Sequence, residues 1–228
     1  NHNLGYEMIF NYNGYGKKKD KEEDSKQEEP EGALIVAEAA DVEPRIIGFT
    51  GILDEDKCGE LMYALITMRD KGRQIELPEK SKDVEDAIIT YQPIEFFINT
   101  DGGSASDMFA LYDLIRVIRE DCPIHMVGLG RVYSAGTLLL ASGTKGERKI
   151  GANCRVMVHN VIGHHAGSLH DLETEIEETK WTQQRYVEAM VKETDMTKNF
   201  LQKLLNRKVN AYLSPEEVVE LGIADIII

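Results

Sequence analysis

Short apolar runs alternate with segments of helical period along most of the chain, and this alternation constrains the fold more than any other feature. Four runs have the length and apolar content of buried strands: RIIGFTG, IEFFINT, IHMVGL and RVMV. Each is followed by a segment with helical spacing. Strands that alternate with helices predict an α/β fold of repeated strand–turn–helix units. Because the runs show little polar alternation, we expect both faces of the sheet to be covered.

The helical segments differ in how much apolar surface they carry. Residues 106–121 place five apolar side chains on one face, which are Met108, Leu111, Leu114, Ile115 and Ile118. A much more polar helix is predicted from about Asp171 to Glu193. The polar stretch 73–92 is expected to be a loop or a small excursion.

The first 32 residues differ in composition from the rest. Residues 17–31 read KKKDKEEDSKQEEPE and are almost entirely charged. Such a segment buries too little apolar surface to offset the entropy lost on ordering. We therefore expect a mobile segment over 1–32 and one domain over 33–228.

Charge and cysteine usage exclude several classes of function. A net charge of −14 argues against binding to nucleic acid or to an anionic membrane, because both rely on basic side chains. No apolar run reaches the ~18 residues of a membrane span, and no secretory signal is recognised. The 3 cysteines show no metal or disulfide spacing. These features predict a cytoplasmic protein.

Reactive or glycine residues follow three of the predicted strands, at the sheet edge where ligands bind in α/β folds. The first site is INTDGGSAS, whose adjacent glycines leave backbone N–H groups open to an anion. Taken alone, that pair favours an ordinary tight turn. The second is Ser134, which precedes an apolar helix and, taken alone, favours a helix cap.

The third site is His159, at the end of RVMV. A histidine there is either a core residue or a base for a nearby serine. His164 and His165 are adjacent, but no carboxylate has a suitable spacing beside them, so we expect no metal. No cofactor is expected either.

Taken together and in this order, the motifs resemble the Clp protease proteolytic subunit family. FINTDGGSAS, YSAGTLLLASGTKGERKIGANCRVMVHNV and YLSPEEVVELGIAD carry the resemblance, which runs from about Arg45 to the C-terminus. It implies a spiral of repeated β-β-α units, shared with crotonase-like enzymes that handle acyl-CoA thioesters. It also implies a protruding handle helix within a region of about 160–195.

The resemblance assigns roles to individual residues. Ser134 becomes the nucleophile and His159 the general base, while the backbone N–H groups of Gly103 and Ala135 form the oxyanion hole. The family's third catalytic residue, usually Asp, corresponds to Asn210 here. Asparagine can orient an imidazole but cannot stabilise its positive charge, so we expect weakened activity. Asp171 and Asp225 are alternative orienting residues.

Other positions also depart from the family pattern. Val209 stands where many relatives carry an arginine that locks two rings together, Tyr133 is bulkier than usual, and Asn160-Val161 replaces a common Gln-Pro. These departures indicate a divergent member of the family.

The resemblance implies a serine endopeptidase that hydrolyses peptide bonds in unfolded proteins or peptides inside an oligomeric chamber. The implied partners are copies of itself in a ring, a second stacked ring, an AAA+ ATPase and related subunits in mixed rings. The alternative is a non-catalytic subunit that forms mixed rings or binds a partner's ATPase. Acyl-CoA enzymes of the same fold lack the Ser-His pair, and Ser-Lys signal peptidases need a membrane anchor that is not recognised here.

Overall fold

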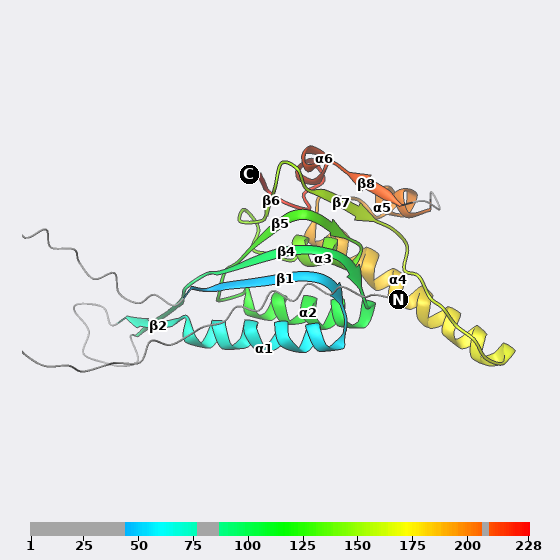
Figure 1. Cartoon of the computed structure of the whole chain (residues 1–228), viewed down its shortest axis with the longest axis horizontal. Coiled ribbons are helices and arrows are strands. Elements are labelled where there is room, and N and C mark those ends of the chain that lie inside the picture. Colours follow the sequence, from blue (N-terminus) through cyan, green and yellow to red (C-terminus); the bar gives the residue numbers. More distant parts are fainter. Residues whose placement is uncertain (1–43, 77–86, 207–209) are drawn as a thin grey trace, which may run out of the picture. The chain divides into compact units, whose positions relative to one another are not determined.

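A largely parallel sheet forms the centre of the protein (Figure 1). The computed structural model describes residues 44–76, 87–206 and 210–228. Within them the strand order is β1-β4-β5-β6-β9, with β7 beside β5 and β8 beside β7. All of these pairs are parallel except β7–β8. The strands are β1 (Ile46–Leu53), β4 (Ile94–Gly103), β5 (Ile124–Tyr133), β6 (Lys149–Ile150), β7 (Arg155–Val158), β8 (Ala211–Leu213) and β9 (Ile226–Ile227).

The helices follow the strands in the predicted alternation, which confirms the α/β class. They are α1 (Glu55–Lys71), α2 (Ala105–Ile118), α3 (Ala135–Ala141), α4 (Leu169–Glu193), α5 (Lys198–Leu205) and α6 (Pro215–Glu220). Helices α1 and α2 lie side by side along the sheet (Figure 1). Of the predicted apolar face of α2, Met108, Leu111, Ile115 and Ile118 are buried and Leu114 is half-buried. The period of 3.6 residues therefore identified the packed face correctly.

The expectation that both faces of the sheet are covered is wrong for β4. Ile94, Phe96 and Ile98 are fully buried, whereas Glu95 is partly exposed and Asn99 is exposed. Successive side chains of a strand point to opposite faces, so β4 packs only one of its faces fully into the core. β1 shows the same one-sided burial. The available signal was the polar Glu95 and Asn99, which share the second face of β4 with one large apolar side chain, Phe97.

The stretch predicted as a loop contains a small hairpin. β2 (Arg73–Glu76) pairs antiparallel with β3 (Ile88–Tyr91), separately from the main sheet. Residues 77–86 between them lie outside the described part of the chain, as do the charged segment 1–32 and Val209.

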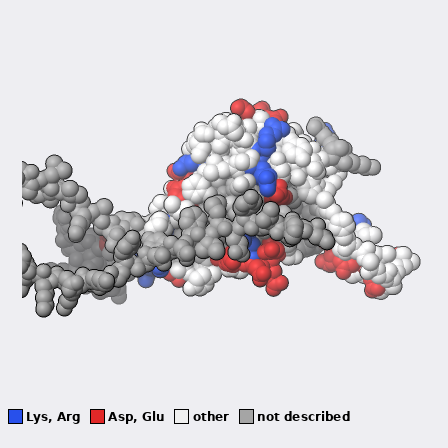
Figure 2. Space-filling view, viewed as in Figure 1, with Lys and Arg blue, Asp and Glu red and all other residues white. Residues whose placement is uncertain are grey.

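Helix α4 has two different halves. Its N-terminal half extends away from the sheet (Figure 1) and carries many acidic side chains, which appear in red on the face shown in Figure 2. It begins at a capping box, in which Ser168 and Asp171 each accept a hydrogen bond from the other's backbone N–H. Its C-terminal half is buried through Tyr186 and Met190. A long helix near the predicted bounds is confirmed.

A buried ion pair connects α4 to the end of α2. Glu193 is 1% exposed and accepts two hydrogen bonds from Arg119, each 2.8 Å long. The hydroxyl of Tyr112 donates a third, of 2.9 Å. Burial raises the pKa of Glu193, but these hydrogen bonds outweigh it and lower the pKa below its usual range. The carboxylate therefore stays ionised inside the protein.

No helix in the described part of the chain is both long enough and apolar enough to span a membrane.

Candidate active site

Three parallel strands bring the predicted site residues to one edge of the sheet. β4 and β7 both pair with β5, with Thr100 opposite Val132 and Tyr133 opposite Met157. β4 ends in the glycine pair, while Ser134 and His159 directly follow β5 and β7. The carboxyl ends of parallel strands meet at one edge, and side chains that follow them can converge there.

Ser134 and His159 are in hydrogen-bond contact. The Nε2 atom of His159 lies 2.8 Å from Oγ of Ser134. The backbone N–H of Ser134 also donates to the carbonyl of Met157, at 2.8 Å, which holds the ends of the two strands in register. An imidazole at this distance can accept the hydroxyl proton as the oxygen attacks a carbonyl.

Ser134 occupies the N-cap position of α3 without acting as a side-chain cap. Its hydroxyl makes no capping hydrogen bond, and its backbone has φ 53° and ψ −117°. It is the only residue other than glycine with positive φ in the described ranges. Non-glycine residues in such conformations cost about 1–3 kcal/mol, and they concentrate at functional sites. The alternative that Ser134 merely caps a helix is therefore not supported.

Ser134 leaves no room for a side chain at Gly102, the first residue of the glycine pair. A Cβ atom on Gly102 would lie 2.6 Å from Cβ of Ser134, and φ at Gly102 is +99°. Thr100 is fully buried and fixes this turn, since its Oγ1 accepts from the N–H of Gly102 at 3.0 Å and donates to the carbonyl of Gly51 at 2.5 Å. The role of Thr100 was not predicted from the sequence, although the threonine directly before Asp-Gly-Gly in INTDGG was the available signal of a fixed turn.

A cavity of about 400 Å³ opens in front of the serine. Ser134 and His159 line it together with Gly103 and Ala135, the two residues predicted to supply oxyanion N–H groups. Ala135 is the first residue of α3, where N–H groups have no partner within the helix. The cavity therefore brings together a serine hydroxyl, an imidazole and the two residues predicted to supply backbone donors, which are the kinds of group that acyl transfer requires.

The surroundings of His159 favour the neutral form of its imidazole. It is half-buried, and this burial lowers the pKa of its imidazole although the backbone of Asn160 opposes the effect. The lowered pKa favours the uncharged ring at neutral pH. An uncharged imidazole is the form that accepts a proton.

The antiparallel register of β7 and β8, in which Val158 lies opposite Ala211, brings Asn210 level with His159 at the end of the strand pair. Asn210 is exposed, and among the described residues no hydrogen bond joins it to His159. The two alternative carboxylates are occupied elsewhere, because Asp171 accepts from Ser168 and Asp225 accepts from Arg148. Among the described side chains, the hydrogen-bond partner of His159 is Ser134.

The bulky Tyr133 has a packing partner that the sequence did not reveal. Its ring meets that of Tyr212 edge to face, with centroids 5.7 Å apart. As for metals, the described chain holds no group of three or more His, Cys, Asp or Glu side chains arranged around one ion. Nδ1 of His165 lies 3.2 Å from a carboxylate oxygen of Glu175.

Comparison of the sequence with known proteins identifies a matching family. Residues 84–228 match the family described as Clp protease. The chain is 33% identical over 132 residues to the ATP-dependent Clp protease proteolytic subunit 4, chloroplastic, of Arabidopsis thaliana, covering 58% of this chain and 44% of the relative. It is 30% identical over 135 residues to the ATP-dependent Clp protease proteolytic subunit 1 of Prochlorococcus marinus, covering 59% and 67%. The match thus spans less than half the length of the Arabidopsis relative.

Proposed function

The chain belongs to the Clp protease family, as a divergent member, and we propose that it is a serine endopeptidase in which Ser134 and His159 perform the chemistry. The observation that carries the proposal is the 2.8 Å contact between Oγ of Ser134 and Nε2 of His159 at the mouth of a cavity. The strained backbone of Ser134 supports it, because a structural serine needs no such conformation.

The proposed reaction proceeds in two halves. Oγ of Ser134 attacks the peptide carbonyl while Nε2 of His159 takes its proton, and the N–H groups of Gly103 and Ala135 hold the oxyanion. The C–N bond then breaks, and His159 returns the proton to the leaving amine. Water attacks the acyl-enzyme with His159 as base again, which releases the acid and restores the serine hydroxyl. Loss of one oxyanion donor typically costs about 100- to 1000-fold in rate.

The proposal that Asn210 orients the imidazole of His159 rests only on the resemblance to the Clp protease family. Its exposure and its lack of a hydrogen bond to His159 lend it no support. A Ser-His pair without an orienting carboxylate retains a base but loses stabilisation of the imidazolium. The proposal therefore includes weakened activity.

The proposal extends to partners by way of the family. Both relatives are named proteolytic subunits of ATP-dependent proteases. We infer a homo-oligomeric ring, stacked in pairs, that receives unfolded chains from an AAA+ ATPase, and mixed rings with related subunits. A reducing compartment such as the cytoplasm fits the three cysteines, which are all free and buried.

A second candidate is a non-catalytic subunit of a mixed ring. The exposure of Asn210, which makes no hydrogen bond to His159 among the described residues, is the observation that favours it. The Ser134–His159 contact counts against it, because a purely structural subunit does not need that pair.

Hydrolysis of a fluorogenic peptide by the assembled protein tests the proposal. We expect slow turnover that Ser134→Ala abolishes, whereas Ser106→Ala, an exposed serine on α2, leaves it unchanged. Turnover that survives in Ser134→Ala would contradict the assignment. An inactive wild type that forms normal rings would favour the non-catalytic subunit.

A further inference from the structure

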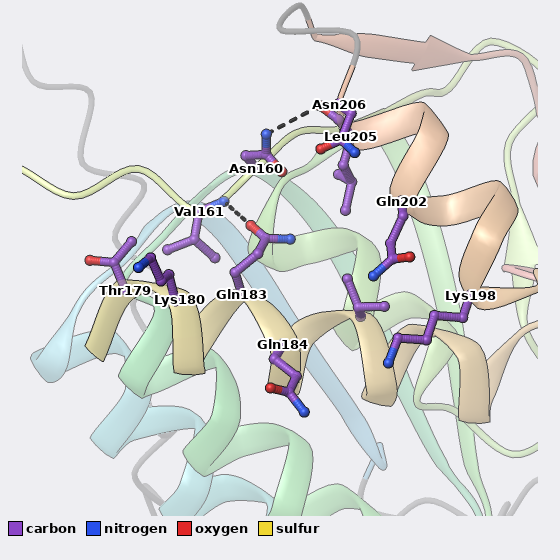
Figure 3. A pocket seen from close by; sticks show the side chains of 11 residues that line it. Asn160, Val161, Thr179, Lys180, Gln183, Gln184, Lys198, Gln202, Leu205 and Asn206 are labelled. Carbon is purple, nitrogen blue, oxygen red and sulfur yellow. Dashed lines mark hydrogen bonds between the residues drawn. The ribbon is translucent and has the colours of Figure 1, made fainter. Parts of the chain in front are cut away.

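A second cavity adjoins the candidate active site (Figure 3). It has a volume of about 590 Å³ and lies between the chain that follows β7, helix α4 and helix α5. Asn160 and Val161 line both cavities, so they form a shared wall directly after His159. Cavities of about 300–1,000 Å³ are the size that holds small ligands.

Two hydrogen bonds fix this shared wall from the side of the second cavity. The side-chain N–H of Asn160 donates to the carbonyl of Leu205 at 3.1 Å, near the end of α5. The backbone N–H of Val161 donates to Oε1 of Gln183 at 2.7 Å. Both bonds are drawn in Figure 3. Hydrogen bonds to α4 and α5 therefore hold the two residues of the connecting loop that separate the second cavity from the catalytic one.

Side-chain amides dominate the polar lining. Gln183 uses its oxygen for Val161, which leaves its two N–H donors unused. The amides of Gln202 and Asn206 make no hydrogen bond within the described chain. Figure 3 shows Gln202 turned from α5 into the space above α4. A primary amide offers the same donor and acceptor pair as a peptide bond, so this lining matches a peptide backbone whatever its side chains are.

The lining of the second cavity is positively charged, although the net charge of the whole chain is −14. Two lysines line the cavity and no carboxylate does. Lys180 is paired with Glu177 at 2.7 Å. Lys198 has no ion-pair partner among the described residues, and Figure 3 shows its amino group turned toward α4 across the cavity. An ammonium in this setting is suited to bind a carboxylate.

We propose that this cavity is a product site, which binds a short peptide with a free C-terminal carboxylate. Lys198 pairs with the carboxylate, and Gln183 and Gln202 hydrogen-bond to the peptide backbone. The proposal rests on the proposed peptidase function, because each hydrolysed bond creates one new carboxylate and an uncut chain has none at that point. Because Asn160 and Val161 line both cavities, the proposed product site directly adjoins the cavity in which that carboxylate forms.

Binding can be measured without turnover. The full-length Ser134→Ala protein is titrated against an N-fluoresceinyl Ala-Ala-Leu tripeptide, as the free acid and as the C-terminal amide, with fluorescence polarisation as readout. We expect the acid to bind about tenfold or more tightly than the amide, as for a charge-assisted hydrogen bond. Lys198→Met removes that preference. Lys203→Met, an exposed lysine on the same helix outside the cavity, keeps it.

Gln202→Ala provides a second variant, and we expect it to weaken both peptides. Equal affinity for acid and amide would overturn the proposal, and so would a preference that survives Lys198→Met or no binding at millimolar peptide. Circular dichroism of each variant separates lost binding from lost folding. The proposed peptidase function is tested by serine reactivity and this site by peptide affinity, so one can fail while the other stands.

Discussion

At the scale of single residues, the candidate site depends on one serine in an unusual backbone conformation. Positive φ at Ser134 turns its hydroxyl away from the capping position and toward His159. Sequence spacing placed both residues after strands, but it could not give their 2.8 Å separation, which depends on β5 pairing with β7. It also could not show that Asn210 stays exposed, because a motif match carries no information about contacts in a single chain.

The pH dependence of peptide hydrolysis follows from the histidine. Its pKa is lowered by burial from the ordinary value of about 6.5, and the neutral form is the active base. We therefore expect kcat/KM to fall on the acid side with a midpoint below about 6.5. His170→Gln, an exposed histidine on α4, should leave this midpoint unmoved. A midpoint above that value in the wild type would contradict the neutral, half-buried base.

At the scale of elements, hydrophobic periodicity predicted the helices well and the sheet faces poorly. Helix α2 buries nearly the set of residues that the pattern indicated. β4 buries one face only, because its second face carries the polar Glu95 and Asn99 beside Phe97. The hairpin β2–β3 lies in the stretch expected to be a loop or a small excursion, where the β-branched and aromatic run IITY of β3 was the available strand signal. The hydrophobic pattern of one segment does not show which distant segment it pairs with.

The junction of α2 and α4 depends on a buried ion pair. Removing one partner of such a pair leaves an uncompensated charge and costs about 3–5 kcal/mol. We expect Arg119→Met to lower the free energy of unfolding by about this amount, because Glu193 is 1% exposed.

The matched control is Arg69→Met, which breaks the partly exposed pair with Asp121 and should cost less than about 1 kcal/mol. Urea denaturation at a fixed protein concentration measures both variants. Equal losses would mean that Glu193 finds another partner or water when Arg119 is absent.

At the scale of the whole molecule, the described chain exposes apolar side chains that an assembly would cover. On α4 these include Leu169, Ile176 and Trp181, which are 75%, 49% and 55% exposed. The resemblance predicts that this helix and the chain before it form the contact between two rings.

Assembly should therefore respond to a charge on the apolar side of α4. We expect Ile176→Glu to shift the protein to a smaller species on a calibrated sizing column, because a buried, unpaired carboxylate opposes association. Thr174→Glu adds the same charge at another exposed position of the helix and should have little effect. Identical elution of wild type and Ile176→Glu at a size above the monomer would show that assembly does not use this surface.

The central claim is that Ser134 is a nucleophile activated by His159, and reaction with a serine-directed fluorophosphonate tests it most directly. Mass spectrometry of the assembled wild type should find one adduct, on Ser134. The adduct should be absent in Ser134→Ala and form at least about 100-fold more slowly in His159→Gln, since a general base typically contributes that much or more. An assembled wild type that remains unlabelled, or equal labelling rates with and without His159, would contradict the account.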